Sequence, residues 1–78
     1  MKNVTIYSTP TCSYCKAAKA FFKDHNVAYT EKDVAADQAA RAEMVEKSHQ
    51  MGVPVIFVDS DMTVGFDEDR LKQLLAVS

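Results

Sequence analysis

Two cysteines, Cys12 and Cys15, are the residues of this chain whose type and spacing point most directly to chemistry. Ser13 and Tyr14 separate them, so the four residues form a Cys-x-x-Cys motif. Such a pair can cycle between dithiol and disulfide, bind a metal ion with further ligands, or lie unreactive in a core. Each role requires a different structural setting, which the flanking sequence indicates.

The motif lies where a predicted strand gives way to a predicted helix. Residues 4–7 are β-branched and aromatic, and the turn-forming residues 8–11 follow them. Apolar side chains then recur at three- and four-residue spacing from position 13 to about position 25, which predicts a helix. The two cysteines therefore lie at the start of that helix.

A helix start favours a reactive thiolate. Its unpaired backbone N–H groups carry about half a positive charge, and a cysteine there has its pKa lowered from about 8.5 to roughly 3.5–7.5. We therefore expect Cys12, the first of the pair, to be the exposed nucleophile. Cys15 lies one turn further in, where it is suited to attack a mixed disulfide and release the product.

Three other interpretations fit the cysteines less well. A zinc site usually has four ligands, and the further candidates, His25 and His49, are 24 residues apart, unlike the His pair of a zinc finger. A disulfide between Cys12 and Cys15 would contribute roughly 2 kcal/mol as a staple, against about 3 kcal/mol for a fifteen-residue loop. Inert core cysteines would not require disulfide spacing at a helix start. Redox chemistry is favoured.

Composition limits the class of protein. The 78 residues are expected to form one domain, 1–78, with 47% hydrophobic and 26% charged residues, which is ordinary for a globular chain. The net charge of -2 argues against nucleic acid as a partner. The longest apolar run, residues 53–58, is too short to cross a bilayer, and the first residues lack a secretory core. We expect a cytoplasmic protein without a membrane partner.

Further elements follow the first helix. The sequence predicts a strand at 27–32 with Val27, Tyr29 and Glu31 on one face, a helix at 33–50, an apolar strand at 55–58, a short strand at 62–64, and a final helix capped by Asp67. The second helix is expected to bury Ala36, Ala40, Met44 and Val45 and to end near Gly52. Leu71, Leu74 and Leu75 are expected to pack the last helix down.

This order, βαβαββα, predicts an α/β fold. A strand-helix-strand start requires a parallel pair with a right-handed crossover, and the last two strands are close enough in sequence to form a hairpin. The expected result is a four-stranded mixed sheet flanked by helices on both faces.

Three segments together resemble the glutaredoxins, a branch of the thioredoxin-fold redoxins, over essentially the whole chain. They are residues 6–15 (Ile-Tyr-Ser-Thr-Pro-Thr-Cys-Ser-Tyr-Cys), residues 52–58 (Gly-Val-Pro-Val-Ile-Phe-Val) and residues 65–67 (Gly-Phe-Asp). The resemblance implies a thioredoxin fold and a dithiol-disulfide oxidoreductase that reduces protein or mixed disulfides through Cys12 and Cys15. It also implies a role in electron transport and cell redox homeostasis.

The resemblance implies a substrate groove beside the cysteines. Tyr14 would frame the substrate, and a cis bond between Val53 and Pro54 would leave the Val53 backbone free to pair with an extended thiol peptide. Gly65, Phe66 and Asp67 would form the turn that closes the groove. Phe66 either fills the core or presents a docking surface, and Met51 either lines the groove or fills the core.

Two departures from the family pattern concern glutathione. Thr9 stands where many glutathione-using members carry a lysine, and Val64-Gly65-Phe66 replaces a segment with a Gly-Gly pair. The Gly-Phe turn is similar to that of redoxins that donate hydrogen to ribonucleotide reductase and are reduced by thioredoxin reductase. We expect a monomer with no bound cofactor or metal, reduced by a thioredoxin reductase-like flavoenzyme or by glutathione as co-substrate.

The alternative function is transport of an iron–sulfur cluster. Some glutaredoxins with Ser after the first Cys, as at Ser13, hold a [2Fe–2S] cluster between two subunits, with glutathione supplying two thiols. Such a cluster needs four thiolates, so this alternative requires a dimer.

Overall fold

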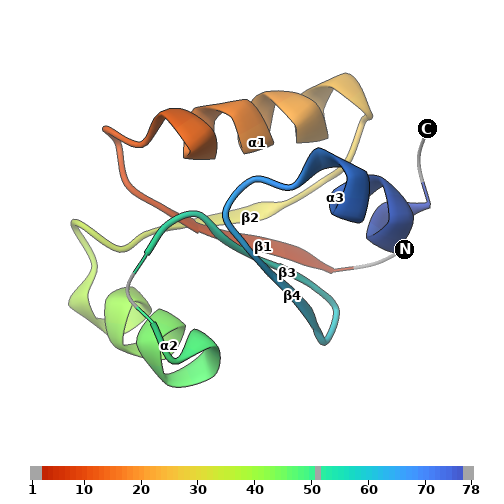
Figure 1. The fold of residues 1–78 in the computed structure, drawn as a ribbon. Coiled ribbons are helices and arrows are strands. Elements are labelled where there is room, and N and C mark those ends of the chain that lie inside the picture. The colour runs from red at the N-terminus through yellow and green to blue at the C-terminus, as the bar shows by residue number, and fades with distance from the viewer. Residues whose placement is uncertain (1–2, 51, 77–78) are drawn as a thin grey trace.

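A four-stranded mixed sheet forms the centre of the molecule (Figure 1), and the computed structural model describes residues 3–50 and 52–76. Met51 lies outside the described residues. The elements are β1 (Val4–Ser8), α1 (Ser13–Asp24), β2 (Thr30–Asp33), α2 (Gln38–Ser48), β3 (Val55–Val58), β4 (Asp61–Val64) and α3 (Glu68–Leu75). The predicted βαβαββα order is confirmed.

The strands lie in the order β2-β1-β3-β4. β1 pairs with β2 in parallel and with β3 antiparallel, while β3 and β4 form the predicted hairpin. In this register Tyr7 faces Val55, and Val55 faces Val64. The segments that follow β1, precede β3 and follow β4 therefore leave the sheet at the same end.

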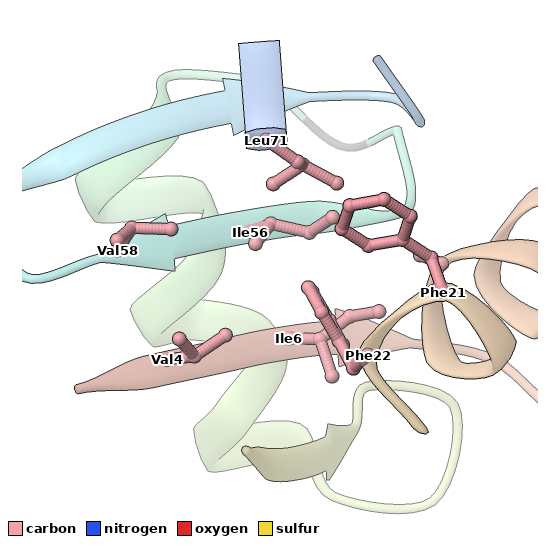
Figure 2. Close-up of a cluster of buried hydrophobic side chains, with 8 residues drawn as sticks. Val4, Ile6, Phe21, Phe22, Ile56, Val58 and Leu71 are labelled. Carbon is pink, nitrogen blue, oxygen red and sulfur yellow. The ribbon is translucent and has the colours of Figure 1, made fainter. Parts of the chain in front are cut away.

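Helices cover both faces of the sheet, as predicted. α1 and α3 lie on one face and α2 on the other (Figure 1). The first face carries a hydrophobic cluster in which side chains from the two central strands meet both helices (Figure 2); its members are Val4, Ile6, Ala18, Phe21, Phe22, Ile56, Val58 and Leu71. On the α2 face, Tyr7, Val34, Ala40, Met44 and Val55 form a second cluster. Each face of the central strands is therefore buried, which explains why β3 is apolar throughout.

β2 is shorter than predicted, because the cap of α1 extends into the segment before it. Asn26 has a left-handed φ of 56°, and the Val27 N–H donates to the Phe22 carbonyl over 2.8 Å. This closes the helix in a Schellman-type cap, so the Val27 N–H is unavailable for pairing with β1. The predicted alternation still holds, since Val27 and Tyr29 pack on the first cluster and Glu31 bonds to Lys19 of α1.

The predicted bounds of α2 are wrong at both ends. Asp33 Oδ1 accepts from the backbone N–H groups of Ala35 and Ala36, and Asp37 is the N-cap, so residues 34–36 form a turn before the helix. Ala36 is consequently exposed rather than buried. At the other end His49 takes a left-handed φ of 59° and stops the helix three residues before Gly52. α3 begins as predicted, with Asp67 accepting from the Arg70 N–H over 3.1 Å.

A polar network ties α2 to the sheet. Glu43 of α2 accepts a hydrogen bond from the hydroxyl of buried Tyr7 and bonds to Lys32 Nζ at 3.0 Å and Lys47 Nζ at 3.1 Å. The hydrogen bond from Tyr7, followed by those from the two lysines, lowers the pKa of Glu43 from 4.5 to about 2. Burial, followed by this contact, raises the pKa of Tyr7. The network therefore holds Glu43 as a carboxylate.

We predict that Glu43→Gln lowers the free energy of unfolding at neutral pH by about 1 kcal/mol, a value reduced for solvent screening of this partly exposed group. Because the folded pKa of Glu43 lies near 2, below its ordinary 4.5, the carboxylate contributes its full stability above pH 4.5 and loses it as the pH falls toward 2. Urea unfolding near neutral pH and at about pH 3 measures the difference. Glu46→Gln, on the exposed side of α2, is the matched control. An equal loss at both pH values would contradict this origin.

Candidate active site

Cys12 occupies the N-cap of α1, the position that the sequence predicts. Its backbone is extended, with φ −84° and ψ 114°, and its Sγ accepts a hydrogen bond of 3.1 Å from the Cys15 N–H. The Cys12 carbonyl accepts the first helical bond, from the Lys16 N–H at 3.2 Å. A sulfur atom thus takes the place of the oxygen that usually caps a helix, and the free N–H groups favour negative charge on it. Cys12 is also partly exposed, in contrast to Cys15.

Cys15 lies behind Cys12 and has no exposed surface. Burial, followed by its hydrogen bond to Cys12, raises the pKa of the Cys15 thiol to about 12. A backbone hydrogen bond from Thr9 and the charge of Lys19 act in the opposite direction. Both cysteines are free thiols in this structure. Cys15 is therefore a buried thiol whose charged form is disfavoured, and the two cysteines differ in exposure.

The remaining predicted groove residues come from the same end of the sheet. Pro54 precedes β3 and Gly65 follows β4, and the Gly65 N–H donates to the Pro54 carbonyl over 2.7 Å. The bond between Val53 and Pro54 is cis, as the family resemblance implies. Gly65 has a φ of +81°, a conformation in which a side chain would be strained. This requirement explains the one glycine that the turn retains.

The apolar side chains near this end differ in exposure. Tyr14 is 67% exposed and Val64 is 49% exposed, whereas Val53 is half-buried and Pro54 is buried. Tyr14 and Val64 are the large hydrophobic residues that the described part of the chain leaves open to solvent. Sequence reasoning missed Val64, because a β-branched residue in a strand suggests core.

Phe66 and Asp67 have structural contacts of their own. The Phe66 ring packs edge to face on Phe21, with ring centroids 6.1 Å apart, beside the first cluster. Of the two interpretations that the sequence leaves open for Phe66, this contact supports the core. Asp67 is exposed and caps α3. Their predicted roles in substrate binding remain predictions.

A polar trio near Cys15 was not predicted as part of the site. Glu31 Oε2 accepts from Ser8 Oγ at 2.9 Å and from Lys19 Nζ at 2.7 Å. The hydrogen bond from Lys19, followed by that from Ser8, lowers the pKa of Glu31, and the same ion pair raises the pKa of Lys19. The available sequence signal was the four-residue spacing from Cys15 to Lys19. The sequence placed Glu31 on one face of its strand with Val27 and Tyr29, but it did not indicate which helix that face meets.

The two histidines lie apart from the cysteines' end of α1. His25 follows the last turn of α1, with its ring 4.4 Å from that of Phe21, and His49 is exposed at the end of α2. Within residues 3–50 and 52–76 there is no group of three His, Cys, Asp or Glu side chains that could hold a metal ion. Of the helices in this part of the chain, none combines the length and hydropathy of a membrane span.

Sequence comparison places these features in a known family. The sequence model of the glutaredoxin family matches residues 4–62. This chain belongs to the glutaredoxin family. It is 42% identical over 72 residues to a glutaredoxin-like protein of the rubredoxin operon of Clostridium pasteurianum, covering 92% of this chain and 96% of that protein. It is 38% identical over 68 residues to glutaredoxin 3 of Escherichia coli, covering 87% of this chain and 82% of that protein.

The fold is the thioredoxin fold. The crystal structure of a point variant of a thioredoxin-like protein superimposes with a TM-score of 0.93 at 36% identity, and each chain covers 100% of the other. Glutaredoxins are in general thiol-disulfide oxidoreductases, and the family assignment rests on most of the chain rather than on the Cys-x-x-Cys motif alone.

We predict that Cys12 reacts with iodoacetamide at least about a hundredfold faster than Cys15 at neutral pH, because Cys15 is buried and its thiol is protonated. The Cys15→Ser and Cys12→Ser variants isolate each thiol, and mass spectrometry follows the labelling. Removing Cys12 also removes its effect on the pKa of Cys15, but burial, the larger cause, remains. Labelling in urea should bring the two rates together. Equal rates in the folded variants would overturn the assignment of the two roles.

Proposed function

We propose that this chain reduces disulfides of proteins, or mixed disulfides, through Cys12 and Cys15. The observation that supports this most strongly is the pairing of a partly exposed Cys12, whose sulfur caps α1, with a fully buried Cys15 one turn away. The Cys12 thiolate attacks one sulfur of the substrate disulfide, forms a mixed disulfide and expels the other sulfur as a thiolate. Cys15 then loses its proton and attacks Cys12 Sγ, which forms the Cys12–Cys15 disulfide and releases the reduced substrate. An external reductant returns two electrons to the pair.

The end of the sheet offers a surface for an extended substrate. Within the described part of the chain, the backbone of Val53 makes no hydrogen bond, since the β1–β3 ladder begins at Val55. An extended peptide could therefore pair with it as an added strand. Exposed Tyr14 and Val64, near the same end of the sheet, would supply apolar contact.

We further propose that a thioredoxin reductase-like flavoenzyme reduces the Cys12–Cys15 disulfide better than glutathione does. Thr9, whose carbonyl accepts from the Cys12 N–H, presents no positive charge for a glutathione carboxylate. The single Gly65 leaves one flexible position where many family members have two. The loss of charge-assisted contacts of about 1.5–3 kcal/mol each would weaken glutathione by roughly tenfold or more.

The iron–sulfur alternative requires four thiolates around one cluster. With Cys15 buried, one chain presents one accessible thiolate, so a cluster would need a second chain and two outside thiols. Protein purified without oxygen should be colourless under the oxidoreductase proposal. Visible absorbance together with a dimer would support the cluster instead.

We predict that Cys12→Ser abolishes reduction of a protein disulfide, whereas Cys15→Ser accumulates a mixed disulfide with the substrate. The first variant lacks the attacking sulfur, and the second lacks the group that resolves the intermediate. Insulin reduction measures turnover, and non-reducing electrophoresis detects the trapped complex. Turnover by Cys12→Ser, or a complex trapped through Cys15, would contradict the proposal.

The choice of reductant can be tested by supplying two systems to the same protein and the same protein disulfide. We predict that turnover with thioredoxin reductase exceeds turnover with glutathione and its reductase by at least about tenfold. Thr9→Lys should raise the glutathione-linked rate by about tenfold, because it restores a charge-assisted contact. Thr30→Lys adds the same charge on β2 as a control. Phe66 is left unchanged, since its ring packs on Phe21. Equal rates in the unsubstituted protein would contradict the prediction.

A further inference from the structure

The polar trio of Ser8, Glu31 and Lys19 joins three elements beside the active site. Ser8 ends β1 and is 1% exposed, Glu31 lies in β2, and Lys19 lies in α1. Both hydrogen bonds go to the same oxygen, Glu31 Oε2, from Ser8 Oγ at 2.9 Å and Lys19 Nζ at 2.7 Å. The Glu31 carboxylate therefore holds the Lys19 ammonium in place, and the buried Ser8 hydroxyl holds the carboxylate.

The lysine held in this way lies one helical turn after the buried cysteine. Lys19 follows Cys15 by four residues, which places the two side chains on one face of α1. Burial raises the pKa of the Cys15 thiol, and the nearby charge of Lys19 acts in the opposite direction. The Lys19 side chain is 25% exposed, so solvent screens its charge less than it would screen a lysine on the open surface.

A positive charge near Cys15 is needed when Cys15 attacks the mixed disulfide on Cys12. Cys15 must become a thiolate in a site where burial opposes charge. Once Cys12 is in a mixed disulfide, its sulfur carries no charge. The other charged or titratable groups nearby influence Cys15 only indirectly. Glu31 and Tyr29 interact electrostatically with Lys19, and Lys23 interacts electrostatically with Glu31. Among the described residues, Lys19 is the cation that acts on Cys15.

We propose that Lys19, oriented by Glu31 and Ser8, is a positioning residue that stabilises the Cys15 thiolate during resolution of the mixed disulfide. This rests on the oxidoreductase function proposed above. Lys19 keeps its proton throughout. The proton of Cys15 passes to water, the Cys15–Cys12 sulfur bond forms, and the bond from Cys12 to the substrate sulfur breaks. The leaving sulfur departs with the electron pair and takes up a proton from solvent.

The same contacts could merely stabilise the fold, and the experiment must separate the two roles. Stoichiometric dithiobis(nitrobenzoate) does so, because each thiolate it releases absorbs visible light. The first release reports attack by Cys12, and the second reports attack by Cys15 on the mixed disulfide. Stopped-flow absorbance of the whole chain measures both rates across a range of pH.

Lys19→Met should slow the second release by about threefold to tenfold and leave the first nearly unchanged. A rise of about one unit in the pKa of the resolving thiol reduces its thiolate fraction tenfold, and greater basicity recovers about threefold through nucleophilicity. The rate profile of the second phase should move to higher pH by about one unit. Lys19→Arg should retain most of the rate of the second release. The rate of Glu31→Gln should fall between those of the unsubstituted protein and Lys19→Met. Lys16→Met removes an exposed charge from the same helix and should change neither phase.

Three results would overturn the proposal. They are an unchanged second phase in Lys19→Met, an equal slowing of both phases, and an equal effect of Lys16→Met. A failure of the proposed function itself looks different, because the first release would then be absent or would persist in Cys12→Ser. Urea unfolding of Lys19→Met separates lost stability from lost rate.

Discussion

The hydrogen bond from the Cys15 N–H to Cys12 Sγ couples the start of a helix to the position of a reactive sulfur. An N-cap side chain must lie close to the N–H groups of the first turn, since it replaces their missing helical partners. When that side chain belongs to a cysteine, the requirement for a cap also fixes where the sulfur lies and what charge it favours. Cys15 then falls in the first turn, on the side that meets the sheet, so its burial follows from the same geometry.

The register of the sheet supplies the rest of the site. Because Tyr7, Val55 and Val64 lie side by side on three strands, the cysteine loop, the Val53–Pro54 segment and the Gly65 turn are all held at one end. The hydrogen bond from Gly65 to Pro54 joins two of these segments directly. Hydrophobic packing on both faces keeps the three strands in place. A chain of this length thus positions several loops around one sulfur with a single small sheet.

The sequence predicts elements best where local chemistry and burial agree. The apolar run of β3 has the predicted bounds because both faces of that strand are covered. α1 begins at the predicted residue, Ser13, and α3 follows its predicted cap, Asp67. The ends of β2 and α2 differ because Asn26 and His49 adopt left-handed conformations, which non-glycine residues signal only weakly. The turn built on Asp33 likewise resembles a helix start in sequence, since aspartate favours both settings.

In the site, too, features set by neighbouring residues were predictable and contacts between distant residues were not. The spacing of the cysteines and their place at a helix start are local features, and they lead to the positions found. The trio of Ser8, Glu31 and Lys19 brings together residues from three elements, so no single window of sequence contains it. The contact of Phe66 with Phe21 spans most of the chain and depends on how α1 packs beside the turn before α3.

The composition of β2 has a consequence for association between chains. β2 lies at the edge of the sheet, where unpaired backbone groups offer a template for another strand. Its residues are Thr-Glu-Lys-Asp, without an apolar side chain, and its two central residues point to opposite faces, Glu31 to Lys19 and Lys32 to Glu43. Any strand added at this edge would have to lie beside those charges on both faces. The ion pairs that anchor two helices therefore also place charge on both faces of this edge, which disfavours pairing with another strand.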